Sequence, residues 1–527
     1  MVVFTKFGQI FQSMDETSKL LLICSFVLLI FSLILFNKST KKGLLFLFSS
    51  SLCIGAAFAT FNPYLNLWDE QFHALVAKNL IDNPLKPTLY QETPLEFNYK
   101  SWIANHIWLH KPPLSLWQIA VSIKVFGVNY FAVRVPSIIM HALLVFPIHS
   151  IGKTIWNEKT GYYAALVFSF LNFPLELVAG YQTSDHVDMA FMFYITMSIW
   201  AWIKFYETRR PRWIVVLGLF VGLAILTKWL VGLLVFAGIG SALIGDSELR
   251  KSWQFWKYLL LSVSLICILV LPWHVFAYLN FPQEYLHEFQ YNTQHFYTIV
   301  EGHGGGYWYY WKNLFTLYGS ADLLPYLILF SLVFVWKFVR HKNYALFLLV
   351  MIICPYAFFT LAETKMPAFT AIVIPLIILV TCAFVGGILD FYQSKSYRWQ
   401  AFSKWLLLPV LLLLALNLIN PKRIYGVHFK DHGNEVLGRN DYKSRTTMIS
   451  TTSFPIDQKC ILFIDDPKAM YHENILWMFY HDDVYAYERS SFTVDLKAKS
   501  LAPYCIFELK NGVLVMLSKP ILSSENY

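Results

Sequence analysis

The sequence predicts a polytopic α-helical membrane protein that carries a small extracytoplasmic domain of mixed α and β structure at its C-terminal end. Of its 527 residues 57% are hydrophobic and only 14% are charged, and the mean hydropathy is +0.48. Soluble domains usually contain about a quarter charged residues and less than half apolar residues. The composition changes after residue 419, where long apolar runs give way to mixed polar sequence.

The apolar runs predict about twelve or thirteen transmembrane helices, because most of them reach the length that a bilayer requires. The first run lacks a small-residue cleavage site and is followed by KSTKK, so we interpret it as an anchor and not as a signal peptide. The runs lie at residues 20–36, 43–61, 130–152, 160–180, 188–206, 213–227, 229–244, 256–278, 314–336, 343–361, 367–391 and 404–419.

The loops between these runs divide by charge, which predicts their sidedness. One set of alternate loops is rich in Lys and Arg and is therefore expected in the cytoplasm. The other set faces outward and holds most of the unusual polar residues, so we expect any active site on the outer face. The net charge of +9 is dispersed among short loops and gives no basic face for nucleic acid. The outward segments are residues 62–129, 180–188, 227–229, 279–313, 362–366 and the C-terminal part.

Two domains follow from these patterns. Residues 1–419 form the transmembrane domain, in which 62–129 is the first outer loop with interfacial helices. Residues 420–527 form the extracytoplasmic domain, with strand-like runs CILFI (460–464), DVYAY (483–487), CIFEL (505–509) and VLVML (513–517). Cys460 and Cys505 could form a disulfide only if this domain is extracytoplasmic, and free thiols are the alternative.

The first candidate motif is WDEQFHA at residues 68–74, which places two adjacent carboxylates at a membrane face. Asp69 or Glu70 in a half-buried pocket could serve as a general base, and His73 would share a helix face with Asp69. The alternative is that both carboxylates simply complement the dipole of a helix N-terminus.

The second motif, HKPPLSLW at residues 110–117, predicts a proline-started interfacial helix over 112–126. Lys111 would lie at the membrane surface, where an ammonium suits a phosphate headgroup. Interfacial snorkelling of a single lysine is the alternative. Arg134 could bind phosphate through two hydrogen bonds, or pair with a nearby carboxylate.

The third motif is YQTSDHVDMAF at residues 181–191, where Asp185 and Asp188 open an outward-starting helix. We expect a functional role for at least one of them and a capping role for the other. Lys228 and Lys365 lie in outward turns, where positive charge is disfavoured, and an anionic ligand would explain both. The histidines of loop 281–311, including His303, match no strong metal motif. The sum of these features suits an enzyme that handles an amphiphile with a phosphate head and a lipid tail.

In these motifs and their order the chain resembles the GT-C fold glycosyltransferases that depend on polyprenyl-phosphate sugars. The group includes the protein O-mannosyltransferases and the bacterial aminoarabinose transferase that modifies lipid A. The resemblance covers roughly residues 60–390. The matching features are Asp69-Glu70, Lys111-Pro112, Arg134, the Asp185/Asp188 region, Thr227-Lys228, Leu271-Pro272-Trp273, Tyr309-Tyr310 and Lys365-Met366-Pro367.

The resemblance implies that an acceptor hydroxyl attacks the anomeric carbon of a sugar on a polyprenyl phosphate, with inversion. The acceptor would be a lipid, glycan or protein, and the enzyme would lie in a bacterial inner membrane with its site facing the periplasm. It assigns three groups of residues: catalytic Asp69, Glu70, Asp185 and Asp188; donor phosphate-binding Lys111, Arg134, Lys228 and Lys365; and substrate-binding His73, His110, Tyr309, Tyr310 and His303.

The sequence departs from the aminoarabinose transferase at two positions. Phe72 stands where that enzyme has a basic residue, and His110 where it has an acidic one. These departures weaken the lipid A aminosugar interpretation and argue against a metal site like that of the family. A divalent metal cofactor stays an open alternative. Two other functions also remain open: a transporter or flippase of a lipid-linked sugar, and a non-catalytic assembly or receptor protein.

Overall fold

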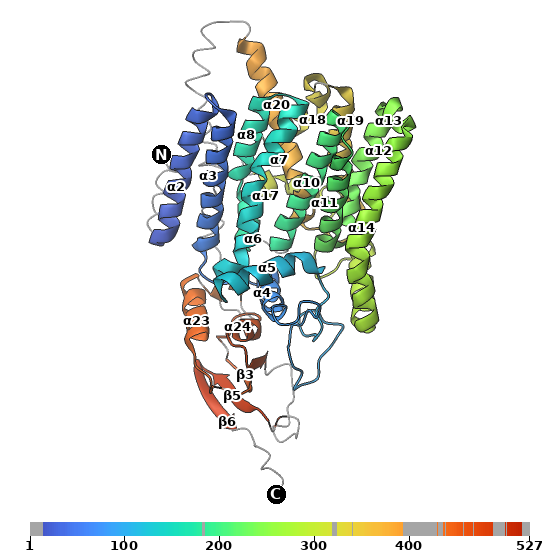
Figure 1. Cartoon of the computed structure of the whole chain (residues 1–527). Coiled ribbons are helices and arrows are strands. Elements are labelled where there is room, and N and C mark those ends of the chain that lie inside the picture. The colour runs from blue at the N-terminus through green and yellow to red at the C-terminus, as the bar shows by residue number, and fades with distance from the viewer. Residues whose placement is uncertain are drawn as a thin grey trace. The chain divides into compact units, whose positions relative to one another are not determined.

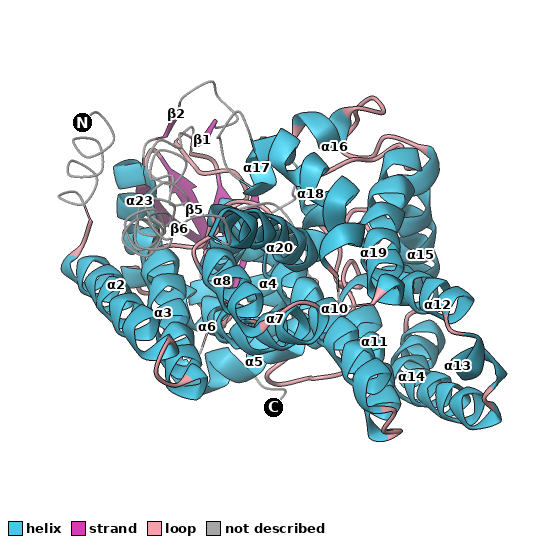
Figure 2. Ribbon diagram, turned by 90° about the horizontal axis from the view of Figure 1, so that it is seen from above, coloured by secondary structure: helices cyan, strands magenta, loops and turns pink. Residues whose placement is uncertain are grey.

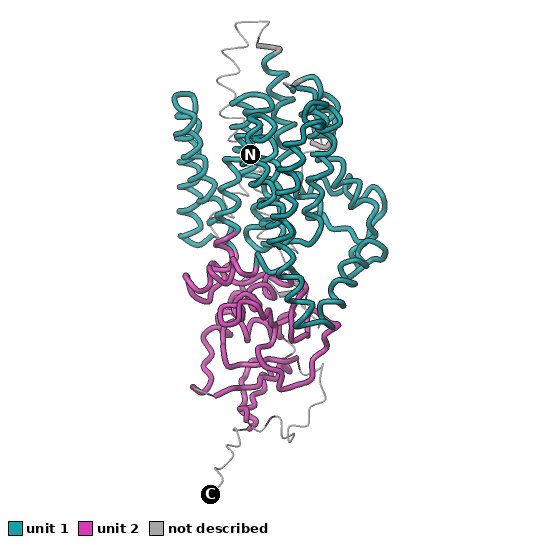
Figure 3. The backbone as a smooth tube through the Cα atoms, turned by 45° about the vertical axis from the view of Figure 1, so that its right-hand side comes forward, with its two compact units in different colours: residues 1–61, 111–115, 137–421 teal, residues 62–110, 116–136, 422–527 magenta. Residues whose placement is uncertain are grey.

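The computed structural model describes residues 14–181, 185–318, 324–339, 341–393, 429–430, 436–437, 439–456, 458–466, 468–488, 501 and 503–518. The chain divides into two compact units, which Figure 3 shows in different colours. Unit 1 comprises residues 1–61, 111–115 and 137–421, and unit 2 comprises residues 62–110, 116–136 and 422–527. This division differs from the expected one, because most of the first outer loop belongs with the C-terminal part.

Unit 1 is helical. Figure 1 shows its long helices from the side, and Figure 2 shows them from above. Two helices, α5 (Pro113–Phe126) and α6 (Tyr130–Leu143), have residues in both units. The remaining helices of unit 1 are α2 (Glu16–Phe36), α3 (Thr40–Phe61), α7 (Val145–Ile155), α8 (Glu158–Ser169), α9 (Asn172–Val178), α10 (Asp185–Thr208), α11 (Arg212–Lys228), η1 (Trp229–Leu234), α12 (Val235–Gly245), α13 (Ser247–Lys251), α14 (Trp253–Asn280), α15 (Pro282–Tyr297), α16 (Tyr309–Lys312), α17 (Leu314–Tyr318), α18 (Leu324–Phe338), α19 (Lys342–Leu361), η2 (Pro367–Val373) and α20 (Ile374–Gln393).

The chain is an integral membrane protein. Among the described residues, seven helical segments are long and apolar enough to cross a membrane, or eight if the pair α8 and α9, bent by 53°, forms one span. One of the seven, Arg212–Gly245, reverses direction at η1. Gly232 of η1 lies back against α11, since a Cβ built on it would lie 3.1 Å from the Cβ of Ala224. The two runs predicted at 213–227 and 229–244 are therefore separate passes. The predicted run 404–419 lies outside the described residues.

Small and hydroxyl-bearing residues bring the helices of unit 1 close together. Ser25 of α2 and Ser50 of α3 each donate a hydrogen bond to the other's backbone carbonyl, at 2.9 and 2.8 Å. In α8, a Cβ built on Gly161 would lie 2.3 Å from the carbonyl oxygen of His149 in α7. Such contacts fit a lipid environment, where helices associate through close backbone packing and interhelical hydrogen bonds.

Unit 2 contains a four-stranded sheet in the order β4-β3-β5-β6, and Figure 1 labels three of these strands, β3, β5 and β6. β3 pairs in parallel with β4 and β5, and β5 pairs antiparallel with β6. All four predicted strands are confirmed. Runs of β-branched and aromatic residues that are bounded by Asp and Gly favour strands. The elements of unit 2 are α4 (Asp69–Asn79), β1 (Phe429–Lys430), β2 (Val436–Leu437), α23 (Arg439–Thr451), β3 (Cys460–Ile464), α24 (Glu473–Tyr480), β4 (Val484–Glu488), β5 (Cys505–Lys510) and β6 (Val513–Ser518).

The helix α4, from the first outer loop, packs into the core of the C-terminal part. Gln71 donates a 2.6 Å hydrogen bond to the hydroxyl of Tyr442. The ammonium of Lys78, which is only 7% exposed, donates to the backbone carbonyls of Met478 and Phe479, each at 2.9 Å. Desolvation lowers the pKa of Lys78, although its ion pair with Asp482 opposes that shift. Residues nearly 400 positions apart therefore share one core.

Candidate active site

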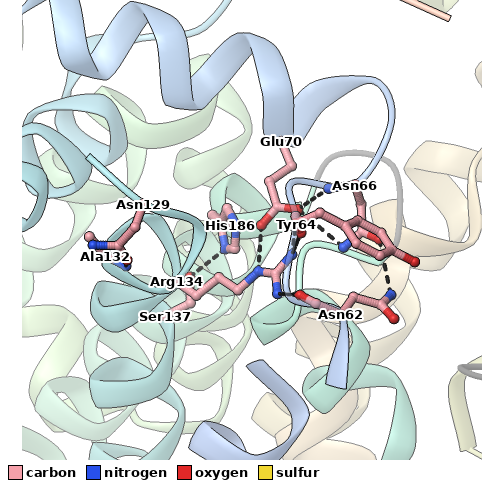
Figure 4. A network of polar contacts seen from close by, with 9 residues as sticks. All are labelled: Asn62, Tyr64, Asn66, Glu70, Asn129, Ala132, Arg134, Ser137 and His186. Atoms are coloured by element: carbon pink, nitrogen blue, oxygen red, sulfur yellow. Dashed lines mark hydrogen bonds and ion pairs between the residues drawn. The ribbon is translucent and has the colours of Figure 1, made fainter. Parts of the chain in front are cut away.

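A buried ion pair fixes the loop that carries the first predicted motif (Figure 4). Glu70 and Arg134 both have fully buried side chains. The guanidinium donates to the Glu70 carboxylate at 2.7 Å through Nε and at 2.9 Å through Nη2. It also donates to the backbone carbonyls of Asn62 and Tyr64, each at 2.7 Å. The backbone amide of Asn66 donates to Glu70 at 2.6 Å.

This arrangement bears on two of the expected roles. Arg134 was predicted to bind donor phosphate, and Glu70 to take part in catalysis. In the structure the guanidinium is directed to a carboxylate and two carbonyls within unit 2, which is the alternative that the sequence left open. Since a buried charge is tolerated only when it is paired, these contacts favour a positioning role for both residues.

Asp69 is the first residue of α4 and is half-buried. The preceding residue, Trp68, has φ 66° and ψ −130°, a conformation that L-residues rarely adopt. The ring centroid of Trp68 lies 4.8 Å from that of Tyr471 and 5.2 Å from that of His472. Aromatic side chains of the C-terminal part thus hold the backbone immediately before Asp69.

The three histidines of this loop lie among aromatic rings in unit 2. His73 is fully buried, with its ring centroid 5.8 Å from that of Trp108. His110 is 7% exposed and stacks on Trp102 with ring centroids 4.8 Å apart. His106 Nδ1 lies 2.6 Å from the carbonyl oxygen of Tyr90. These surroundings provide packing for His73 and His110, whose predicted roles in substrate binding stay predictions.

Unit 1 holds the second cluster of predicted residues. The ammonium of Lys228, at the end of α11, donates a hydrogen bond to the carboxylate of Asp188 in α10. It also lies 5.0 Å from the ring centroid of Phe369 in η2. Asp188 is 1% exposed and Lys228 is 18% exposed. Asp185 begins α10, one turn before Asp188. The structure thus pairs Asp188 with Lys228, a cation that was predicted to bind phosphate.

Lys365 lies just before η2 and is 4% exposed. Its ammonium donates to the carbonyl oxygen of Ala362. Its backbone amide donates to the carbonyl oxygen of His303 at 2.8 Å, and an isolated antiparallel bridge joins Gly304 to Thr364. The outer loop that contains His303 is therefore attached to the turn that contains Lys365.

The remaining predicted residues of unit 1 are Lys111, Tyr309 and Tyr310. Lys111 is partly buried and is followed by the start of α5 at Pro113. Tyr309 and Tyr310 begin α16, and Tyr310 is 3% exposed. Burial raises the pKa of the Tyr310 hydroxyl, so it stays protonated and able to donate.

Sequence reasoning missed three aromatic residues near the candidate residues: Phe369, whose ring lies beside Lys228, Trp68, which precedes Asp69, and His472, whose ring lies beside Trp68. Each is one aromatic ring among many in the sequence, so no spacing signal distinguished it. In the part of the chain that the structure describes, no group of three or more His, Cys, Asp or Glu side chains could hold a metal ion.

The spanning helices, the small terminal sheet domain and the buried carboxylate and ammonium groups together define a GT-C type membrane protein. The fold is similar to that of ArnT from Cupriavidus metallidurans bound to undecaprenyl phosphate, with a TM-score of 0.59, 16% identity and coverage of 83% of this chain and 84% of that chain. It is also similar to the oligosaccharyltransferase AglB from Archaeoglobus fulgidus, with a TM-score of 0.55, 12% identity and coverage of 86% and 65%. The predicted GT-C fold is confirmed.

Sequence comparison gives consistent relatives. The family model described as dolichyl-phosphate-mannose-protein mannosyltransferase matches residues 110–273. An undecaprenyl phosphate-alpha-4-amino-4-deoxy-L-arabinose arabinosyl transferase of Pseudomonas fluorescens strain Pf0-1 is 26% identical over 62% of this chain and 57% of its own length. A transferase of the same description from Proteus mirabilis strain HI4320 is 26% identical over 62% and 59%. The chain thus matches somewhat more than half the length of these relatives.

Proposed function

We propose that this protein is a membrane glycosyltransferase that moves a sugar from a polyprenyl-phosphate donor to an acceptor hydroxyl or phosphate, with inversion. The observation that carries the proposal is the cluster in unit 1, where the Lys228–Asp188 pair lies beside η2 and Lys365 directly precedes η2. The ammonium groups of Lys228 and Lys365 supply positive charge, which suits a lipid phosphate. The named relatives and the ArnT structure with undecaprenyl phosphate support this donor class.

The donor side of the site would be formed by the cations. As the bond between the anomeric carbon and the phosphate oxygen breaks, negative charge develops on the departing lipid phosphate. Lys365 and Lys228 would stabilise that charge because they are held in place before the reaction begins. Asp188 would keep Lys228 oriented, and Lys111 would contribute further positive charge at the membrane surface.

Asp69, the first residue of α4, would act on the acceptor. Asp69 would accept the proton of the acceptor hydroxyl while the hydroxyl oxygen forms its bond to the anomeric carbon. The sugar would pass to the acceptor in a single displacement, which inverts the anomeric configuration. Glu70 and Arg134 would act as positioning residues, because their ion pair holds the loop before Asp69.

We infer that the protein lies in a bacterial inner membrane with this site facing the periplasm. The charge of the alternate loops supports that orientation, and the bacterial transferases among its relatives support the location. The acceptor would be a lipid, a glycan or a protein. The relatives named for amino-deoxy-arabinose make a pentosyl donor the first one to try, with a mannosyl donor as the second.

The test is sugar transfer by purified protein from undecaprenyl-phosphate-linked aminoarabinose or polyprenyl-phosphate mannose. Asp69→Asn should lower kcat at least about 100-fold, and Lys365→Met should lower kcat by a similar factor. The matched controls are Asp82→Asn and Lys42→Met, which alter exposed residues and should leave kcat within about twofold of wild type. Absence of transfer from every donor would refute the proposal, and unchanged turnover in Asp69→Asn would exclude Asp69 as the base.

A further inference from the structure

Unit 2 contains a cavity of about 120 Å³ that the transfer chemistry does not use. One wall comes from the first outer loop. The other comes from the C-terminal part of the chain, at the start of α24 and the end of β4. The cavity has space for several waters. The residues that matter for its chemistry are Tyr90, Glu96, His472, Asn474, Tyr487 and Glu488.

The side-chain amide of Asn474, in the cavity wall, forms a described hydrogen bond through its nitrogen but not through its oxygen. Asn474 is 7% exposed. Its Nδ2 donates to the hydroxyl of Tyr90 at 3.1 Å, whereas its buried Oδ1 has no hydrogen-bond partner among the described residues. A buried polar atom without a hydrogen bond is unfavourable. A ligand that donates a hydrogen bond to Oδ1 would satisfy it.

Two other residues of the cavity wall carry groups that, when ionised, only accept hydrogen bonds. Glu96 and Glu488 contribute two carboxylates. Donor-rich ligands such as hydroxyls or an ammonium group match this wall, and anionic ligands do not. The stacked rings of Tyr90 and Tyr487, whose centroids are 5.1 Å apart, supply an apolar surface next to these acceptors. Hydroxyl groups around a ring with apolar C–H faces are the chemistry of a sugar.

The cavity adjoins the candidate general base through His472. This residue lines the cavity, and its ring centroid lies 5.2 Å from that of Trp68, the residue before Asp69. The same ring lies 5.2 Å from that of Phe72 on α4. His472 has φ 56°, a left-handed conformation at the start of α24. A ligand in the cavity would therefore be one aromatic ring away from the backbone that presents Asp69.

We propose that this cavity is the acceptor subsite and binds an uncharged or amino-bearing sugar unit of the acceptor. That the bound sugar belongs to the acceptor rests on the proposed function, whereas sugar binding by the cavity does not. Asn474 Oδ1 accepts a hydrogen bond from a hydroxyl or amino group of the sugar. Glu96 and Glu488 exclude anionic sugars. The Tyr90–Tyr487 pair contacts the apolar side of the sugar ring.

The experiment measures binding to the full-length protein in detergent without any donor. The probes are methyl β-D-glucoside, methyl β-D-glucosaminide and methyl β-D-glucuronide, and the readout is saturation-transfer NMR with a titration for Kd. The first two probes should bind, and the glucuronide should bind at least tenfold more weakly. Asn474→Leu removes the acceptor oxygen and should weaken both glucoside and glucosaminide at least tenfold. Asn474→Asp keeps an acceptor oxygen and should retain glucosaminide binding.

The variants also separate this inference from the proposed function. If the Leu variant is misfolded, the Asp variant still tests the prediction through its preference for the amino sugar. Equal Kd values for the glucoside and the glucuronide would overturn the inference, as would wild-type Kd values in Asn474→Leu. Sugar binding by a protein that transfers no sugar would refute the proposed function alone. Transfer with an unchanged acceptor KM in Asn474→Leu would refute the subsite alone.

Discussion

The ion pair between Glu70 and Arg134 gives the sharpest prediction about how the loop before Asp69 is held. Glu70→Gln removes the negative charge and keeps the shape of the side chain. The guanidinium then stays fully buried, next to the backbone carbonyls of Asn62 and Tyr64, and faces a neutral amide in place of a carboxylate. We expect this substitution to destabilise unit 2 and to disorder the loop.

The magnitude follows from the geometry. One carboxylate oxygen becomes an NH2 group, so one of the two guanidinium–carboxylate hydrogen bonds, at 2.7 and 2.9 Å, is lost together with the negative charge, in a site without solvent access. Removal of one partner of a buried pair costs about 3–5 kcal/mol. For a folding unit of this size, that cost lowers the Tm by about 6–20 °C. Glu70→Gln combined with Arg134→Met removes both charges and should cost less than the sum of the two single substitutions.

The assay uses Cys460 and Cys505 as reporters, because both are buried in the sheet of unit 2. The rate at which they react with a thiol-specific dye is measured against temperature under reducing conditions. In the background variant, the other cysteines are replaced by Ala, and these are Cys24, Cys53, Cys267, Cys354 and Cys382. Labelling of Cys460 and Cys505 then reports the opening of unit 2 separately from the membrane helices.

Two results would refute this reasoning. A Tm within about 2 °C of the background value in Glu70→Gln would show that the pair does not hold unit 2 together. Additive losses in the double variant would show that the two charges act independently. Loss of sugar transfer at unchanged stability would return Glu70 to the catalytic role that the sequence suggested.

Three further predictions concern other contacts. Arg445 pairs with two buried carboxylates, one of them Asp466 at 2.8 Å, so Arg445→Met should cost unit 2 about 3–5 kcal/mol in the same labelling assay. Burial works to raise the pKa of Asp466, but hydrogen bonds from backbone amides and from Arg445 outweigh it and hold the pKa below its usual range. A carboxyl group whose pKa is lower in the folded than in the unfolded state stabilises the fold above the unfolded pKa. The Tm of unit 2 should therefore fall below about pH 4, and less so in Asp466→Asn, as measured by thermal denaturation. In unit 1, Gly161→Ala would place a Cβ 2.3 Å from the carbonyl oxygen of His149 and should cost about 1–3 kcal/mol in a detergent thermal-denaturation assay, whereas Gly240→Ala, with open space around it, should be nearly neutral.

Local patterns in the sequence were enough to predict the strands and most of the helices. The four strand runs of the C-terminal part correspond to β3, β4, β5 and β6 within one residue at each end. The reversal between α11 and α12 also follows from the sequence, because Lys228 interrupts two apolar runs. These features depend on neighbouring residues, and neighbouring residues are visible in a sequence.

The composition of unit 2 could not be predicted in the same way. The sequence placed the first outer loop with the membrane helices, because the two are adjacent in the chain. The structure groups that loop with the C-terminal part through contacts such as Gln71 to Tyr442. The sequence left phosphate binding and pairing with a carboxylate both open for Arg134, because its pairing with Glu70 over 64 positions has no local signal.

The position of Asp69 is determined by contacts along the whole of α4. Near the start of the helix, Glu70 is joined to Arg134. At the far end, Lys78 is buried and donates to the last carbonyls of α24, where the helix dipole favours a positive charge. Trp68 has a backbone conformation that would cost about 1–3 kcal/mol without such support. A helix fixed at both ends can hold that conformation, and the carboxylate that follows it is then presented in one orientation. The C-terminal part of the chain therefore acts on the candidate general base through α4, even though most of the residues that resemble a glycosyltransferase lie outside it.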